Sequence, residues 1–224
     1  MTRGILIAGN ESSLCNTLAA EAAKRVEHFA IAVIPSRLSH TPHGKADTPA
    51  EKASLSLQWN PSSPISARTL VLAAENRLGQ INEAILVCSP PSIRRPAAEL
   101  SLSEIETLVN DHIKGWFFLA RELAVVFRAK QSGTLALVFS EVAPASAKDD
   151  VADLLGPCAL ASFQGFARSL CASAIAEPYL TMGFSNSDAS AEAAFASFVF
   201  KYLDEGNTRN NGKLYKYGKL NLFK

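Results

Sequence analysis

Few side chains in this sequence have the types and spacing that metal or redox chemistry needs. The cysteines are scattered without a C-x-x-C pair, which predicts small buried residues in a reducing compartment. They are Cys15, Cys88, Cys158 and Cys171. His40 and His43 have an H-x-x-H spacing, but no cluster of cysteines or carboxylates nearby supplies further ligands. The sequence therefore predicts no metal site.

The C-terminal stretch KLYKYGKLNLFK, residues 213–224, alternates lysine with apolar or aromatic side chains. This pattern suits an acidic or nucleic-acid partner, but it is also typical of an edge strand protected by charge. The whole chain has 22 basic and 21 acidic residues, so no global field attracts nucleic acid or an acidic membrane. We expect an edge strand here, and no nucleic acid or membrane as a partner.

Length and composition predict one globular domain over residues 1–224. Hydrophobic residues make up 48% of the chain, which is enough to offset the chain entropy lost on folding. The apolar run Ile5–Ala8 is too short for the core of a signal peptide, and no later run reaches the roughly 18 apolar residues of a membrane-spanning helix. We therefore expect a cytoplasmic protein.

Short apolar runs alternate with helical patterns along the chain, and this order predicts a doubly wound parallel sheet in a three-layer α/β/α fold. The helix at 64–80 has a proline at its start and Gly79 near its end. The long helix at 101–133 opens with Ser101 and Glu104 at capping-box spacing. Strands are expected at 4–10, 29–37, 54–59, 83–91, 134–140 and 179–185, with a terminal strand or hairpin at 212–223.

Taken in this order, the residues resemble the short-chain dehydrogenase/reductase family over essentially the whole chain. The matching segments are Gly79 before the fourth strand, HIKGWFF in the long helix, GTLALVFS in the fifth strand and SFQGFARSLCAS in the next helix. In that family a Rossmann-like sheet binds NAD(P). The resemblance implies one Rossmann-like domain with a dinucleotide crevice at the carboxyl ends of its strands.

The resemblance places the family's TGxxxGxG phosphate loop on residues 8–15, where only Gly9 keeps a glycine. A side chain at this turn prevents the backbone from approaching the pyrophosphate, and Glu11 adds negative charge. The helix N-terminus that follows can still hold an anion. The loop is therefore either an altered dinucleotide site or an empty turn. Its candidate residues are Gly9, Asn10, Ser12 and Ser13.

Two more places bear on a cofactor. Arg37 stands where the resemblance puts a selector for the adenosine phosphate of NADP, although a solvated loop arginine is the simpler explanation. Cys88 and Ser89 replace the family's Asn-Asn-Ala-Gly segment beside the nicotinamide ribose, and Pro90 and Pro91 cannot donate backbone hydrogen bonds. NADP and no cofactor at all remain alternatives.

The family's proton-transfer pair, a tyrosine and a lysine four residues later, is missing. Alignment on GFARSL places Gly156 at the tyrosine position and Leu160 at the lysine position. The first tyrosine of the chain is Tyr179, in the strand after this helix. A general acid contributes about 100-fold to 10,000-fold in rate, so we expect the family's carbonyl reduction to be very slow.

Two residues do match positions of the family's catalytic site. Ser140 aligns with the catalytic serine, and His112 lies at the asparagine position of the long helix. A serine beside a histidine suits a nucleophile and base, which leaves a hydrolase or transferase as an alternative. The simpler interpretation is a locally bonded hydroxyl at a strand end and a half-buried histidine at a helix irregularity.

The resemblance also implies an assembly and a shortened lid. In the family, subunits pair through the two helices that correspond to residues 102–129 and 157–174. We expect a homodimer or homotetramer through them, because they are rich in aromatic side chains. These are Trp116, Phe117, Phe118, Phe127, Phe163 and Phe166. After the sixth strand, the segment 183–195 runs almost directly into the last helix, so the family's substrate lid is expected to be absent.

The sequence thus favours a protein of this family without its oxidoreductase activity, acting as a binding or scaffold subunit. A divergent NADP-dependent oxidoreductase and a Ser140–His112 hydrolase are the alternatives.

Overall fold

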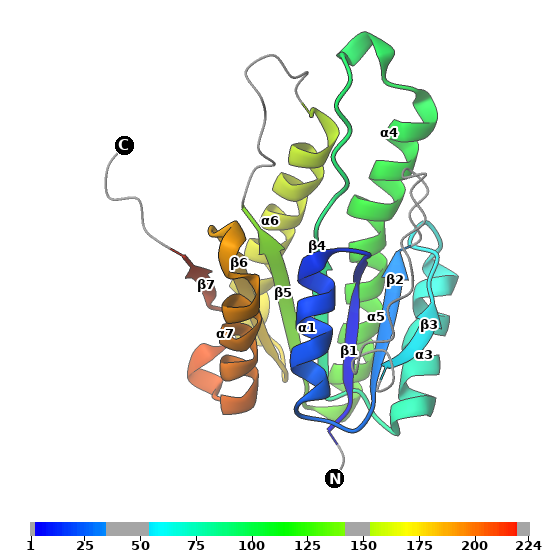
Figure 1. The fold of residues 1–224 in the computed structure, drawn as a ribbon. Coiled ribbons are helices and arrows are strands. Elements are labelled where there is room, and N and C mark those ends of the chain that lie inside the picture. The colour runs from blue at the N-terminus through cyan, green and yellow to red at the C-terminus, as the bar shows by residue number, and fades with distance from the viewer. Residues whose placement is uncertain (1–2, 35–53, 142–152, 219–224) are drawn as a thin grey trace.

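A computed structural model describes residues 3–34, 54–141 and 153–218. Its seven strands form one sheet in the order β3-β2-β1-β4-β5-β6-β7, and every neighbouring pair is parallel (Figure 1). The strands are β1 Ile5–Asn10, β2 Phe29–Ile34, β3 Ser54–Gln58, β4 Glu83–Cys88, β5 Thr134–Ser140, β6 Leu180–Asn186 and β7 Leu214–Tyr217. The predicted parallel three-layer fold is confirmed.

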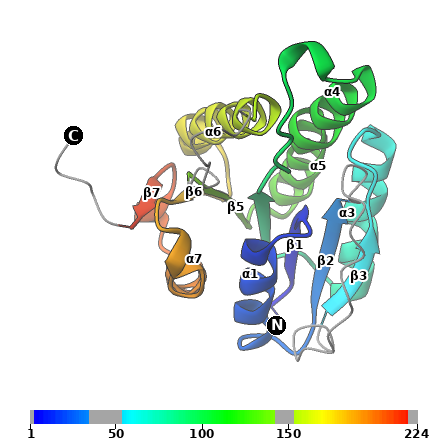
Figure 2. The ribbon, with the colours of Figure 1, turned by 45° about the horizontal axis from the view of Figure 1, so that its top comes forward.

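Helices cover both faces of the sheet, as Figure 2 shows. One layer contains α3 Pro64–Leu78, α4 Leu102–Val109, α5 Gly115–Lys130 and α6 Leu155–Ser173. The other layer contains α1 Ser13–Ala23 and α7 Glu192–Glu205. In β1, Leu6 packs toward the first layer while Ile5 and Ile7 pack toward the second. Because both faces are covered, the strand is apolar throughout, as a central parallel strand must be.

Local sequence signals set the helix ends. Ser101 and Glu104 form the predicted capping box of α4. The helix α3 has Pro64 at its first position and ends before Gly79, whose φ of 77° favours glycine. None of the described helices combines the length and apolar character needed to cross a membrane.

The expected long helix is interrupted. A π-helical turn, Asn110–Lys114, joins α4 to α5 and contains His112. Such turns widen the helix by one residue and re-aim the side chains that follow. The next expected helix, 157–174, begins two residues early, at Leu155. Both helices are otherwise where the sequence predicted them.

Candidate functional site

The candidate site lies at the carboxyl ends of β1, β4 and β5, which are neighbours in the sheet. Gly9 and Asn10 end β1, Cys88 ends β4 and Ser140 ends β5. The parallel order therefore brings the sequence-predicted residues of these three strands to one edge. Arg37, with the H-x-x-H pair, lies outside the described residues.

Gly9 is enclosed by protein atoms. A Cβ at this position would lie 3.0 Å from the Val87 Cβ, 3.1 Å from the Val87 carbonyl oxygen and 3.4 Å from the Cys15 Sγ. The glycine thus serves the close packing of β1 against β4 and α1. Gly9 therefore does not leave the backbone open to an approaching pyrophosphate.

Asn10 ties the first loop to the fourth strand. Its Nδ2 donates a hydrogen bond to the Ser89 carbonyl oxygen, and its Oδ1 is buried without a partner. A carbonyl oxygen can only accept, so it repels the oxygens of a phosphate. Asn10 and Ser89 therefore lie side by side at this edge, with the Asn10 side-chain amide bonded to the Ser89 main chain rather than open to a ligand.

Side chains of the protein also bond to each other and to the main chain at the start of α1. The Ser12 hydroxyl accepts a hydrogen bond from the Cys15 N–H at 3.2 Å and caps the helix. The Ser13 hydroxyl donates to the Glu192 carboxylate at the start of α7. The helix N-terminus therefore has a side-chain cap and a carboxylate beside it, where a pyrophosphate would need free N–H groups.

The two cysteines of this edge are inert thiols. Burial raises the pKa of Cys15 to about 12, and burial also raises the pKa of the fully buried Cys88. The thiolate is the reactive form, so neither residue is a nucleophile at neutral pH.

His112 lies in the π-helical turn and is buried, rather than half-buried as the sequence suggested. Burial lowers the pKa of the imidazole to about 4, and its Nδ1 has no hydrogen-bond partner. Among the described contacts no hydrogen bond joins it to Ser140. Since the imidazole is buried and its Nδ1 is unpaired, no third group orients it from that nitrogen, as a catalytic base would need.

The tyrosine position contains a carboxylate that the sequence reasoning missed. Asp153 Oδ1 accepts hydrogen bonds from the N–H groups of Leu155 at 3.1 Å and Gly156 at 3.0 Å, which caps α6. A Cβ on Gly156 would lie 2.5 Å from Asp153 Oδ2 and 3.1 Å from the Pro91 carbonyl oxygen. Leu160, at the lysine position, packs against the core. An aspartate just before the helix was the available signal.

Asp153 also joins two segments of this edge. It pairs with Arg94 in an isolated antiparallel bridge, which connects the segment after β4 to the start of α6. On the other side of the site, only residues 187–191 separate β6 from α7, with a short 3-10 turn between them. The expected direct passage from the sixth strand into the last helix is confirmed.

These residues do not fit the diphosphate of a nicotinamide dinucleotide. The Ser12 hydroxyl already takes the Cys15 N–H at the start of α1, and the side-chain groups beside it are the acceptors Asn10 Oδ1 and the Glu192 carboxylate, which repel phosphate oxygens. Nor do the described residues contain a group of three or more His, Cys, Asp or Glu side chains that could hold a metal ion.

No protein-family model matches the sequence, and no curated protein matches it either. Solved structures match over nearly the full length. A short-chain dehydrogenase from Bacillus anthracis has a TM-score of 0.73 at 12% identity, covering 99% of this chain and 98% of that chain. Acetoin dehydrogenase from Salmonella typhimurium has a TM-score of 0.72 at 14% identity, covering 96% and 94%.

A third similar structure, an NADH-dependent reductase, was solved in complex with NAD. Its TM-score is 0.70 at 12% identity, and the match covers 96% of this chain and 95% of the reductase. The likeness extends over the entire sheet and both helical layers, while few residues are shared.

Proposed function

Since this chain has the fold of the short-chain dehydrogenase/reductase family, we propose that it is a binding or scaffold protein of that fold without the oxidoreductase activity. The observation that carries the proposal is the carboxylate of Asp153, which caps α6 and fills the space at Gly156 where a tyrosine would begin. Leu160 stands at the lysine position and packs against the core, so this position supplies no ammonium group to a proton donor. The four free cysteines suit a reducing cytoplasm.

The test is a titration with NADH and NADPH, in which binding is measured by calorimetry or by the fluorescence of the two tryptophans. We expect no saturable binding of either dinucleotide and no reduction of carbonyl compounds. Submillimolar binding of NADPH would instead support the divergent NADP-dependent oxidoreductase, in which Arg37 would select the adenosine phosphate. One structural neighbour was solved with NAD, so NADH is the necessary comparison.

The hydrolase with Ser140 and His112 stays a prediction. A serine-directed phosphonate probe tests it, because covalent labelling at Ser140 requires an activated hydroxyl. Labelling that is lost in Ser140→Ala and reduced in His112→Gln would favour it over the scaffold.

We further propose that two copies associate through α4, α5 and α6. Of the exposed large apolar side chains on the described α-helices, five lie on α4 and α5 and two on α3, while α1, α6 and α7 contribute none. Along α4 and α5 they form one stripe at helical spacing, which suits an interface better than solvent. Its members are Leu102, Ile105, Val109, Phe117 and Val125, with exposed fractions of 80%, 36%, 37%, 51% and 56%.

The aromatic residues that suggested this interface divide into two groups. Trp116, Phe127 and Phe163 are buried in the core and cover the sheet. Phe166 is 9% exposed and packs on Phe117 with 4.5 Å between ring centroids. Three of the six rings thus cover the sheet, and Phe117, which is 51% exposed, is the ring to change.

Phe117→Asp should convert a dimer to a monomer on a sizing column, because a buried carboxylate without a partner is costly at an interface. Leu72→Asp is the matched control, since Leu72 is 50% exposed on α3, outside α4, α5 and α6. An unchanged dimer in Phe117→Asp would rule out this surface.

A further inference from the structure

A concave site lies at the opposite edge of the sheet, where β1 and β2 begin. Three segments far apart in sequence form it: the residue before the strand β1, the turn after α1, and the last turn of α3. The hollow has a volume of about 300 Å³ and is lined by Arg3, Arg25, Val26, Glu27, His28, Arg77 and Leu78. Three arginines and one histidine therefore line one space.

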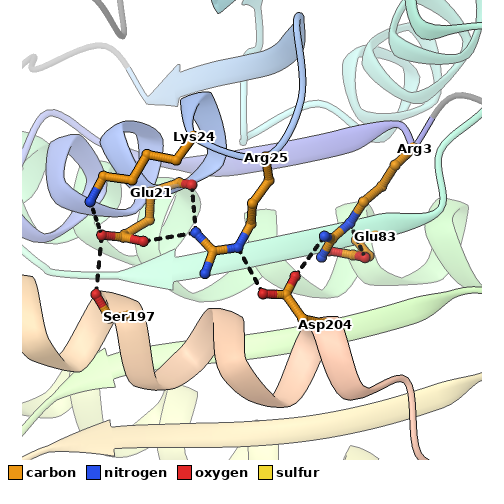
Figure 3. A network of polar contacts seen from close by, with 7 residues as sticks. All are labelled: Arg3, Glu21, Lys24, Arg25, Glu83, Ser197 and Asp204. Carbon is orange, nitrogen blue, oxygen red and sulfur yellow. Dashed lines mark hydrogen bonds and ion pairs between the residues drawn. The ribbon is translucent and has the colours of Figure 1, made fainter.

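Carboxylates hold two of these guanidinium groups in place, as Figure 3 shows. Arg3 donates its Nε and Nη2 to the Glu83 carboxylate at 2.7 and 2.9 Å, and its Nη1 to Asp204 at 2.6 Å. An arginine has five N–H donors, so about two remain on Arg3 after these three bonds. The group is fixed in orientation and still able to donate.

Arg25 is held in the same manner. Its Nε donates to Asp204 at 2.9 Å, and its Nη1 donates to the carbonyl oxygen and carboxylate of Glu21 at 2.9 and 2.8 Å. The guanidinium also lies 4.6 Å from the centre of the Phe200 ring. These bonds use Nε and Nη1, which leaves the donors of Nη2.

Arg77 completes the set. It lies in the last turn of α3, is exposed, and has no polar partner among the described residues. The carboxylates that hold Arg3 and Arg25 do not line the hollow; of the acidic residues, only Glu27 does, and its side chain is 92% exposed. Val26 and Leu78 supply apolar wall.

We propose that this hollow binds a phosphate group, either as inorganic phosphate or as the phosphate monoester of a small molecule. Guanidinium groups match phosphate oxygens with paired N–H bonds, and groups already oriented lose little freedom on binding. Two of the three arginines are oriented in advance by Glu83, Asp204 and Glu21. The site is independent of the candidate cleft at the other edge.

The test is calorimetric titration of the full chain with inorganic phosphate and with phenyl phosphate. Tighter binding of phenyl phosphate would assign a monoester, whose organic part contacts Val26 and Leu78; equal binding would assign free phosphate. Arg77→Ala should weaken binding about tenfold, because a charge-assisted hydrogen bond contributes about 1.5 kcal/mol or more. Saturable binding by neither compound would overturn the proposal.

Arg68→Ala is the matched control, since Arg68 is another exposed arginine of α3 that lines a different groove. It removes the same charge from the same helix and should leave phosphate binding unchanged. Equal weakening by both variants would mean that phosphate only senses the overall charge, and the assigned site would be wrong. Because both side chains are exposed, both variants should unfold at the same temperature as the parent chain.

Discussion

The two edges of the sheet differ in the charged side chains that they carry. At the amino edge, cations and carboxylates form one continuous network across β1, β4, α1 and α7. Its residues are Arg3, Glu21, Lys24, Arg25, Glu83, Ser197 and Asp204 (Figure 3). At the carboxyl edge, the described groups of the candidate site are neutral or bonded to the chain's own atoms, as with Asn10, Ser12 and Asp153.

The difference separates the requirements of the fold from those of a cofactor. Packing of the parallel sheet needs apolar strands and helix caps, and both edges have them. Binding an anionic dinucleotide needs donors at the carboxyl edge, where Ser12 takes the Cys15 N–H and Asn10 presents an unpaired oxygen. The helices and strands of the fold therefore form without groups suited to hold a diphosphate.

The largest expected effect is at His112, near the carboxyl edge. Burial lowers the pKa of the imidazole from 6.5 to about 4, so between these pH values the unfolded chain binds a proton that the folded chain does not. Stability should fall as pH falls through this window, by up to about 3 kcal/mol. In His112→Asn this loss should disappear. Urea denaturation at pH 7 and pH 4.5 measures the free energy of unfolding of both proteins. An equal change in that free energy between the two pH values in both proteins would contradict the burial of a neutral imidazole.

A smaller effect is expected from Arg3→Ala at the amino edge. Burial raises the pKa of Glu83, and the hydrogen bond and charge of Arg3 oppose that rise. Without Arg3 a partly buried carboxylate loses its partner, which should cost about 2 kcal/mol at neutral pH. The cost should shrink as the pH falls and Glu83 takes up a proton, because a raised pKa favours the folded state in acid.

The control for that experiment is Arg3→Ala in a Glu83→Gln background. The neutral amide needs no cation, so the pH dependence of the difference should vanish there. If Arg3→Ala costs the same at every pH in both backgrounds, the side chain contributes packing and the Asp204 contact only.

Gly156→Ala should cost about 1 to 2 kcal/mol, because the added Cβ would meet the Asp153 carboxylate 2.5 Å away. Asp153→Ala alone should cost about 1 kcal/mol through the lost cap of α6. In the double variant the clash is gone, so the two costs should not add. Thermal unfolding of the four proteins measures this coupling, and simple additivity would mean that Asp153 does not fill the tyrosine position.

Sequence patterns predicted the elements well because their signals are local. Ser101 with Glu104, and Gly79 after α3, act on their own helix ends, and the apolar runs identify central strands without knowledge of their neighbours. The position of Gly156 in α6 also followed from alignment alone.

The occupants of the site could not be predicted in this way. Asp153 meets Arg94 only through the fold, and Glu192 reaches Ser13 across 179 residues. The amino-edge network joins Arg3 to Asp204, 201 residues away. Contacts of this kind depend on tertiary geometry, for which a single sequence has no periodic signal.

The smallest expected effect tests how many groups keep a dinucleotide out of the carboxyl edge. Glu192→Gln removes the carboxylate beside Ser13 and should change stability by less than about 0.5 kcal/mol, because the Ser13 contact is exposed. If that charge alone excluded the diphosphate, the variant would gain saturable NADH binding. We expect no such binding, since the Ser12 hydroxyl still caps α1 and the unpaired Asn10 Oδ1 still repels phosphate oxygens. A titration of the parent and the variant shows whether the Glu192 carboxylate alone excludes the diphosphate, or whether the Ser12 cap and the Asn10 oxygen also exclude it.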